Sequence, residues 1–158
     1  MLCVLAYSGI RNSELCNLRV CDVDIGNNRI RIHSGKNFKD RYANITGECA
    51  KVIVEYLRSY PRDDDAQLFT TIVKKNPLAT GDLRKHVRVS SRRANIERRV
   101  YPHLLRHSLA TNLLIRGASL ITIKDQLGHD HYETSLYYLR SIPQRAKAEY
   151  NFCRPSYL

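Results

Sequence analysis

The sequence predicts an α+β fold, a mostly helical domain with a small antiparallel three-stranded sheet. Most of the chain carries apolar residues at helical spacing, whereas alternation of apolar and polar residues is confined to residues 22–45. Strands gathered in one stretch of a helical chain are typical of α+β domains, because strands and helices alternate in α/β domains. The chain has 158 residues, of which 43% are hydrophobic, so we expect residues 1–158 to form one domain with its own core.

The sheet and three helices are expected in the first part of the chain. Residues 29–33 alternate polar and apolar side chains, as a half-buried strand does, and residues 42–45 can return antiparallel to them. Residues 22–25 are the third candidate strand. Apolar positions at helical spacing, ended by glycine or proline, predict helices over residues 2–7, 11–18 and 47–60.

Beyond residue 80 the apolar pattern is helical, apart from a basic connector that ends at Pro102. Ser119 is a candidate N-terminal cap, and Gly117 and Gly128 are candidate helix ends. The helices expected here cover residues 80–94, 103–116, 119–127, 133–139 and 144–150.

Composition and charge restrict the class of protein. The net charge is +11, from 26 Lys and Arg against 15 Asp and Glu, which favours a phosphate polymer or an anionic surface as partner. No apolar run approaches the length of a membrane span, and the apolar start lacks the flanks of a signal peptide. The five cysteines form no C-x-x-C pair, which argues against a disulfide framework or a zinc ribbon. We therefore expect a cytoplasmic protein that binds nucleic acid and no membrane.

Two histidines and an arginine lie at the start of the helix expected after Pro102. His103 and Arg106 are three positions apart and share a helix face, where first-turn N–H groups favour an anion. Ordinary solvated side chains are the alternative. His103 and His107 have the spacing of helical zinc ligands, but Leu104 stands where a zinc hydrolase needs glutamate, so we expect no metal site.

Charged side chains near the expected sheet are further candidates. Glu14 lies three positions after Arg11, where a carboxylate can orient a phosphate-binding guanidinium or form only a weak surface ion pair. Lys36 and Lys39 lie in the turn between the two main strands. A lysine there could protonate a leaving oxygen, although contact with backbone phosphate is the commoner role.

Two adjacent tyrosines, Tyr137 and Tyr138, follow His129. A tyrosine hydroxyl, with a pKa of about 10, is a weak nucleophile. Nearby cations and hydrogen-bond donors would let it attack a phosphodiester. Tyrosines at helical positions are more often packing residues, and adjacent positions point about 100° apart, so at most one tyrosine can face a site.

The order and spacing of these residues resemble the tyrosine recombinase (phage integrase) family. The resembling segments are SGIRNSEL at 8–15, GKNFKDR at 35–41, HLLRHSLAT at 103–111, and LGH at 127–129 with a tyrosine nine positions after the histidine. They are similar to the family's T-G-x-R-x-S-E-L signature, its β-hairpin lysine, its H-x-x-R-H box and its final L-G-H segment. Asn37 is a mild departure, because the family usually has a small residue after the lysine.

The resemblance implies the roles of the phosphate-binding and attacking groups. Arg11, Arg106 and His129 would bind the scissile phosphate and stabilise its pentavalent transition state. Tyr138, favoured over Tyr137 by spacing alone, would attack and form a 3′-phosphotyrosine with a free 5′-hydroxyl.

The resemblance also implies the roles of supporting residues. His103 would assist proton transfer from the tyrosine, Lys36 would protonate the leaving 5′-oxygen, and Glu14 would support Arg11. Bond energy is conserved, so no ATP, metal or other cofactor is implied. The residues expected to contact DNA outside the catalytic centre are Lys39, Arg41, Arg92, Arg93 and His107.

Partners and domain limits follow from the same resemblance. Members of the family act on double-stranded DNA as tetramers, and the apolar tail at residues 151–158 could dock on a neighbouring protomer or fold back on its own chain. The family normally has an N-terminal helical domain that clamps the DNA. Because the chain begins ten residues before Arg11, we expect a catalytic domain without its first helix and without the N-terminal core-binding domain.

Two other functions stay open at this point. A chain with this fold and charge but without the rest of the assembly could be a catalytically silent DNA-binding module. A type IB topoisomerase uses the same phosphotyrosine chemistry but relaxes supercoils alone. The sequence favours a site-specific DNA recombinase, or integrase, over both.

Overall fold

The structure is a computed structural model that describes residues 1–33, 40–71 and 76–128. The predicted α+β fold is confirmed, since these residues form mostly helices with one three-stranded antiparallel sheet. The helices are α1 (Leu2–Ser8), α2 (Asn12–Asn17), α3 (Gly47–Ser59), α4 (Thr80–Arg93), α5 (Pro102–Ile115) and α6 (Leu120–Leu127). The other elements are a 3₁₀ helix, η1 (Val20–Asp22), and the strands β1 (Val23–Asp24), β2 (Arg29–Ile32) and β3 (Arg41–Asn44). The helices predicted at residues 133–139 and 144–150 lie outside the described residues.

The sheet has the strand order β1-β2-β3, with both pairs antiparallel. In the central strand Ile30 and Ile32 are buried while Arg31 between them is exposed. Ile30 lies opposite Ala43 of β3, which is also buried. One face of the sheet therefore packs on the core and the other meets solvent, as the alternating sequence predicts.

The third strand is shorter than the sequence predicts. A strand was expected over residues 22–25, but β1 has two residues and follows η1 directly. Asp22 explains the difference, because its Oδ2 accepts the backbone N–H of Arg19 at 2.9 Å and its Oδ1 lies 2.6 Å from His33 Nε2. These contacts of a buried carboxylate turn the chain at Asp22, where a strand would keep it extended.

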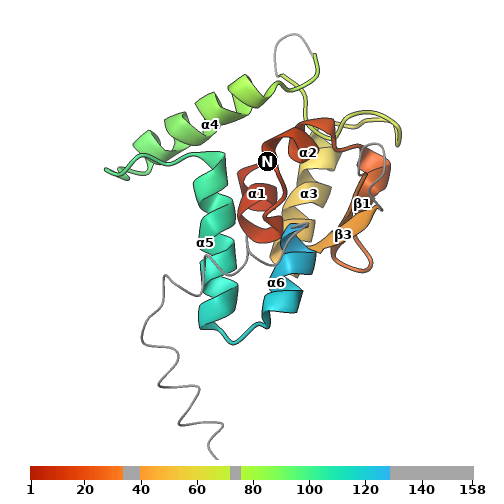
Figure 1. The fold of residues 1–158 in the computed structure, drawn as a ribbon. Coiled ribbons are helices and arrows are strands. Elements are labelled where there is room, and N and C mark those ends of the chain that lie inside the picture. The colour runs from red at the N-terminus through yellow and green to blue at the C-terminus, as the bar shows by residue number, and fades with distance from the viewer. Residues whose placement is uncertain (34–39, 72–75, 129–158) are drawn as a thin grey trace, which may run out of the picture.

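Helix α1 lies at the centre of the fold (Figure 1), where it contacts α5, α3 and β3. The larger hydrophobic core combines residues of α1, α2, the sheet and α3, among them Leu5, Leu15, Ile30 and Ile53. The smaller core joins α5 to α6 and consists of Ala110, Leu114, Ile123 and Leu127. Helix α4 packs against α2 and against α5, and it extends away from the other helices in Figure 1.

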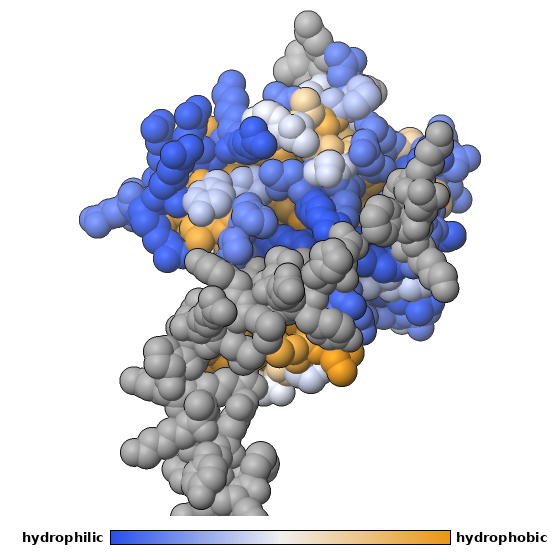
Figure 2. Space-filling model, viewed as in Figure 1, coloured by the Kyte–Doolittle hydropathy of each residue, from blue (hydrophilic) through white to orange (hydrophobic). Residues whose placement is uncertain are grey.

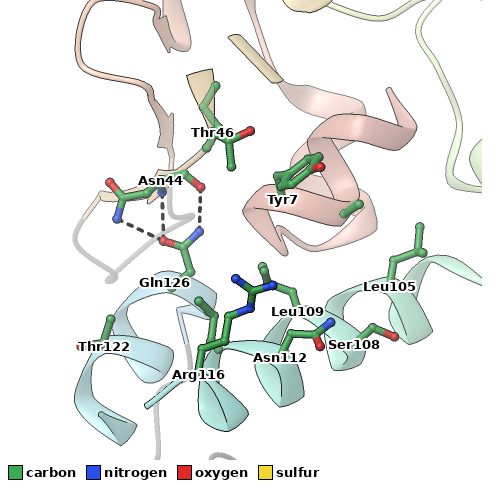
Figure 3. A pocket seen from close by; sticks show the side chains of 13 residues that line it. Tyr7, Asn44, Thr46, Leu105, Ser108, Leu109, Asn112, Arg116, Thr122 and Gln126 are labelled. Carbon is green, nitrogen blue, oxygen red and sulfur yellow. Dashed lines mark hydrogen bonds between the residues drawn. The ribbon is translucent and has the colours of Figure 1, made fainter. Parts of the chain in front are cut away.

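A buried glutamine fixes α6 to the rest of the fold. Gln126 Nε2 donates to Ser8 O at 2.9 Å and to Asn44 O at 2.8 Å. Its Oε1 accepts from Asn44 N at 3.0 Å and from Asn44 Nδ2 at 3.2 Å (Figure 3). The C-terminal end of α6 is thereby held against α1 and the end of β3.

Neither membrane spans nor metal-ligand clusters are found in the described part of the chain. No helix there is long and apolar enough to cross a membrane. Residues 1–33, 40–71 and 76–128 also contain no group of three or more His, Cys, Asp or Glu side chains that could hold a metal ion.

Candidate active site

Arg11 and Arg106 meet at the C-terminal end of α6. Arg106, a buried residue of α5, donates from Nη1 to Gly9 O at 2.6 Å and from Nη2 to Leu127 O at 2.8 Å. Arg11, directly before α2, donates from Nη2 to Gly128 O at 2.6 Å. Carbonyls at a helix C-terminus lack intrahelical partners and carry partial negative charge, so they suit guanidinium groups. The structure therefore brings together the two arginines that the family resemblance assigns to one phosphate.

Glu14 connects the backbone and the side chain of Arg11. Its Oε2 accepts the backbone N–H of Arg11 at 2.6 Å, and its Oε1 accepts from Arg11 Nη1 at 3.0 Å. The first contact is one half of a capping box at the start of α2; the other half is not possible, because an arginine side chain has no acceptor. The supporting role that the sequence gives Glu14 is consistent with both contacts.

A second arginine, Arg41, binds the same carboxylate. Arg41 Nη1 donates to Glu14 Oε1 at 3.1 Å and Nη2 donates to Glu14 Oε2 at 2.9 Å. Arg41 Nη2 also lies 3.1 Å from Leu127 O, the carbonyl that Arg106 uses. The Glu14 and Arg41 side chains are 13% and 16% exposed, against 45% for Arg11. The Arg41–Glu14 pair is thus the inner part of the site and Arg11 the outer part.

The charge state of Glu14 follows from these contacts. Burial alone would raise the pKa of its carboxyl group, but the hydrogen bonds from Arg41 and from the Arg11 backbone, with the charges of both arginines, lower it below its ordinary value. Glu14 is therefore ionised at neutral pH. The three arginines and one glutamate leave the site with a net positive charge.

Two glycines permit the close approach of these elements. Gly9 and Gly128 both have left-handed backbones, with φ of 66° and 65°. A Cβ atom on Gly9 would lie 2.6 Å from Leu127 Cδ2, and one on Gly128 would overlap Arg41 Nε. Any side chain at position 128 would therefore displace Arg41 from the end of α6.

Two histidines of α5 lie beside Arg106. The rings of His103 and His107 meet edge to face, with 4.3 Å between their centroids. Burial and the charge of Arg106 lower the pKa of His103, and burial, His103 and Arg106 lower the pKa of His107. Both imidazoles are therefore mainly neutral at pH 7, and a neutral imidazole can accept a proton.

The other predicted site residues fall into two groups. Lys36, Lys39, His129 and Tyr138 lie outside the described residues, as does Tyr137. Arg92 and Arg93 lie exposed at the C-terminal end of α4. Hydrophilic side chains gather over the region of α4 in Figure 2. The basic side chains in the last turn of this helix suit a polyanion.

Arg41 and Gln126 are the residues whose place the sequence does not reveal. Arg41 was predicted to contact DNA directly, and that prediction stays untested, but its described polar contacts are made within the protein. The only local signal is its position at the start of a half-buried strand. Gln126 carried no prediction, because a polar residue in an amphipathic helix is usually exposed.

A cavity of about 620 Å³ lies next to α6, between α1, α5 and the end of β3. Tyr7, Leu105 and Leu109 are among the residues that line it (Figure 3). Its lining does not include Arg11, Arg41 or Arg106, so it is separate from the arginine site.

Comparison with known proteins identifies the family. The model of the phage integrase family matches residues 1–145. The chain belongs to the phage integrase family.

Relatives of this phage integrase family member are known by sequence and by structure. A tyrosine recombinase of Pseudothermotoga lettingae is 35% identical over 144 residues, which cover 91% of this chain and 49% of that protein. The crystal structure of XerA recombinase aligns with a TM-score of 0.83 at 35% identity, over 98% of this chain and 57% of that chain. XerH site-specific recombinase, bound to a palindromic difH substrate in a post-cleavage complex, aligns with a TM-score of 0.78 at 28% identity, over 94% and 43% of the two chains. The chain spans about half the length of the curated relatives that it matches.

Proposed function

We propose that this chain is the catalytic domain of a site-specific DNA recombinase, which cleaves and rejoins strands through a 3′-phosphotyrosine intermediate. The observation that carries the proposal is the meeting of Arg11 and Arg106 at one end of α6. Two permanently charged guanidiniums in one place suit a phosphodiester. The tyrosine recombinase and XerA relatives support the class of reaction, and XerH with its difH substrate supports double-stranded DNA as the substrate.

The two arginines would act on the charge that develops at phosphorus. A phosphodiester carries one negative charge and its pentavalent transition state carries two, so donors that bind the extra charge accelerate the reaction. Arg11 is 45% exposed and can reach a phosphate, while buried Arg106 forms the floor of the site. A guanidinium has five N–H donors, so the bonds of Arg11 to Glu14 and Gly128 leave further donors for phosphate oxygens.

The remaining groups would move protons. Tyr138 would form the bond to phosphorus as the bond to the 5′-oxygen breaks. His103 would take the tyrosine proton, consistent with its lowered pKa, and Lys36 would give a proton to the 5′-oxygen. His129 would donate a hydrogen bond to the phosphate. In rejoining, a 5′-hydroxyl attacks the phosphotyrosine, and one phosphoester replaces another without ATP or a metal.

The proposal extends to assembly on DNA. We propose that the chain acts as a homo-tetramer on two DNA sites and that apolar residues of the tail, Phe152, Tyr157 and Leu158, dock on a neighbouring copy. Removal of residues 151–158 should then lower the number of chains per DNA complex, measured by analytical ultracentrifugation. An unchanged number would contradict the role of the tail.

The proposed location is the cytoplasm. Within the described residues, Cys3, Cys16, Cys21 and Cys49 form no disulfide with one another, and a reducing compartment keeps thiols in that form.

The covalent intermediate gives the direct test of the reaction. The chain is incubated with a pool of random-sequence duplexes, and the DNA that stays attached in SDS is sequenced to give a cleavable duplex. On that duplex the unchanged chain and Tyr137→Phe should form the adduct, while Tyr138→Phe should not. The opposite pattern would move the nucleophile to Tyr137, and no adduct from any chain would favour a silent DNA-binding module.

Two further measurements separate the remaining classes of enzyme. A recombinase exchanges strands between two duplexes, whereas a type IB topoisomerase relaxes a supercoiled circle without exchange. Full adduct formation in EDTA is expected, and dependence on added divalent metal would contradict the metal-independent reaction.

A further inference from the structure

We infer that Arg41 is a positioning residue: it neutralises Glu14 and joins it to the end of α6, so that Arg11 keeps its charge for the scissile phosphate. The inference rests on the proposed function, because it assigns Arg41 a part in that reaction. Arg41 would touch neither the phosphate nor the nucleophile.

The geometry of the Arg41 contacts supports a fixed orientation. The guanidinium binds both oxygens of the Glu14 carboxylate, at 3.1 and 2.9 Å, and two parallel bonds of this kind fix orientation as well as distance. Nη2 also lies 3.1 Å from Leu127 O. Arg41 thus links three elements that hold the site, namely β3, α2 and α6.

The charges explain why a second arginine is needed there. The Glu14 carboxylate lies 3.0 Å from Arg11 Nη1, so without another partner it would neutralise the cation that is meant for the phosphate. With Arg41 present, the part-buried Glu14–Arg41 pair is neutral as a unit. Glu14 can then orient Arg11 by hydrogen bonds while Arg11 retains its net charge for the DNA.

The low exposure of Arg41 distinguishes it from an arginine whose role is to contact DNA. Its side chain is 16% exposed, and within the described residues its Nε is buried without a hydrogen-bond partner. A Cβ atom added to Gly128 would lie within 2.6 Å of the Cδ, Nε and Cζ atoms of Arg41. The end of the Arg41 side chain is therefore packed against the end of α6. A residue placed in this way can set the position of Arg11 and Arg106 without contacting DNA.

The test uses the cleavable duplex and four chains. These are the unchanged chain, Arg41→Gln, the double variant Arg41→Gln with Glu14→Gln, and Arg29→Gln as a matched control. Arg29 also lies in the sheet and pairs with a carboxylate, Asp24 at 2.9 Å, but it has no described contact with the site. The measured quantities are the single-turnover rate of adduct formation and the slope of DNA affinity against salt concentration.

The inference predicts a specific pattern of rates. Arg41→Gln should slow adduct formation by about a hundredfold, a loss that misplacement of a catalytic group by about 1 Å can cause. Removal of the bare carboxylate in the double variant should restore part of the lost rate. The salt slope should not change, because no phosphate contact is lost, and Arg29→Gln should react at the unchanged rate.

Other results would overturn the inference. One such result is an Arg41→Gln variant that reacts at the full rate, and another is a loss of rate that the added Glu14→Gln substitution does not relieve. A salt slope lowered by about 0.9 would also overturn the inference, because it would show a direct phosphate contact. If circular dichroism shows that Arg41→Gln does not fold, Arg41→Lys serves instead: it keeps the charge without the bidentate geometry and should still slow the reaction. If the unchanged chain forms no adduct with any duplex, the proposed function itself is wrong, and the inference fails with it.

Discussion

Glu14 is the residue on which the charge balance of the site depends. It is the carboxylate shared by Arg11 and Arg41, and its pKa is lowered against the effect of burial. A carboxyl group whose pKa is lower in the folded state stabilises the fold above its unfolded pKa, and that contribution is lost as the pH falls through the folded pKa.

Glu14→Gln should therefore destabilise the fold in a pH-dependent way. At pH 7 we expect a loss of about 2 kcal/mol, the typical worth of hydrogen bonds to a charged group that is mostly buried. The difference from the unchanged chain should shrink at pH 3, below the ordinary pKa of a glutamate, because the unfolded chain then binds a proton that ionised Glu14 in the folded chain does not. Urea unfolding at both pH values measures it.

The control for this prediction is Asp65→Asn. Asp65 pairs with Arg19 at 3.8 Å, and its side chain is 92% exposed, so its removal should have no measurable effect. A Glu14→Gln effect that stays equal at both pH values would contradict the assigned ionisation.

Gly128 and Gly117 form a matched pair of left-handed glycines. Both have positive φ, 65° and 93°, but only a Cβ at Gly128 meets other atoms, those of Arg41. Each alanine variant should lose about 1–2 kcal/mol for the left-handed backbone. Gly128→Ala should lose more and should also slow adduct formation, whereas Gly117→Ala should keep the rate. Equal losses of stability and rate in the two variants would contradict the packing of Arg41 on Gly128.

At the level of elements, the attachment of α6 determines where the carbonyl groups of Leu127 and Gly128 lie, to which Arg106 and Arg11 donate. Gln126 makes hydrogen bonds to Ser8 and Asn44, and it is 7% exposed. Gln126→Leu would remove these hydrogen bonds, would leave the carbonyl of buried Ser8 without the Gln126 donor, and should destabilise the fold by about 2 kcal/mol. The Asn44 amide, which donates to Gln126, should exchange its hydrogen faster, while the exposed neighbour Asp125→Ala should leave it protected. Unchanged exchange in Gln126→Leu would contradict this anchor.

Helix α4 is the element on which the prediction of DNA contacts can be tested. Arg92 and Arg93 are exposed at its C-terminal end. If each binds one phosphate, the double alanine variant should weaken DNA binding and lower the salt slope by about 1.8, or 0.9 for each contact. Affinities measured at several salt concentrations give the slope. The control is Lys51→Ala on α3, where no DNA contact is predicted. Equal salt slopes in the double alanine variant and in Lys51→Ala would contradict DNA contact through α4.

The sequence predicted elements more successfully than it predicted their contacts. The helices at residues 80–94 and 119–127 agree with α4 and α6 because apolar spacing and a serine cap are local signals. The strand at residues 22–25 was too long because the buried contacts of Asp22 depend on His33 and Arg19. Local patterns do not contain such contacts, and for the same reason they do not show that Gln126 is buried.

At the scale of the whole molecule, the candidate site is assembled from four separated parts of the chain. Arg11 and Glu14 belong to the start of α2, Arg41 to β3, Arg106 to α5, and the acceptor carbonyls to the end of α6. The ordered motifs predicted Arg11, Glu14 and Arg106 as members of the site. The inward orientation of Arg41 follows only from the packing of β3 against α6, which the structure shows.

The central claim is that Arg11 and Arg106 bind one scissile phosphate together. The most direct measurement is a crystal structure of the chain on the cleavable duplex with vanadate in place of that phosphate. The account predicts N–H groups of both guanidiniums about 2.7–3.1 Å from equatorial vanadate oxygens, with the Tyr138 hydroxyl oxygen at an apical position. A structure in which either arginine leaves the vanadate unbound, or in which another group occupies the apical position, would contradict it.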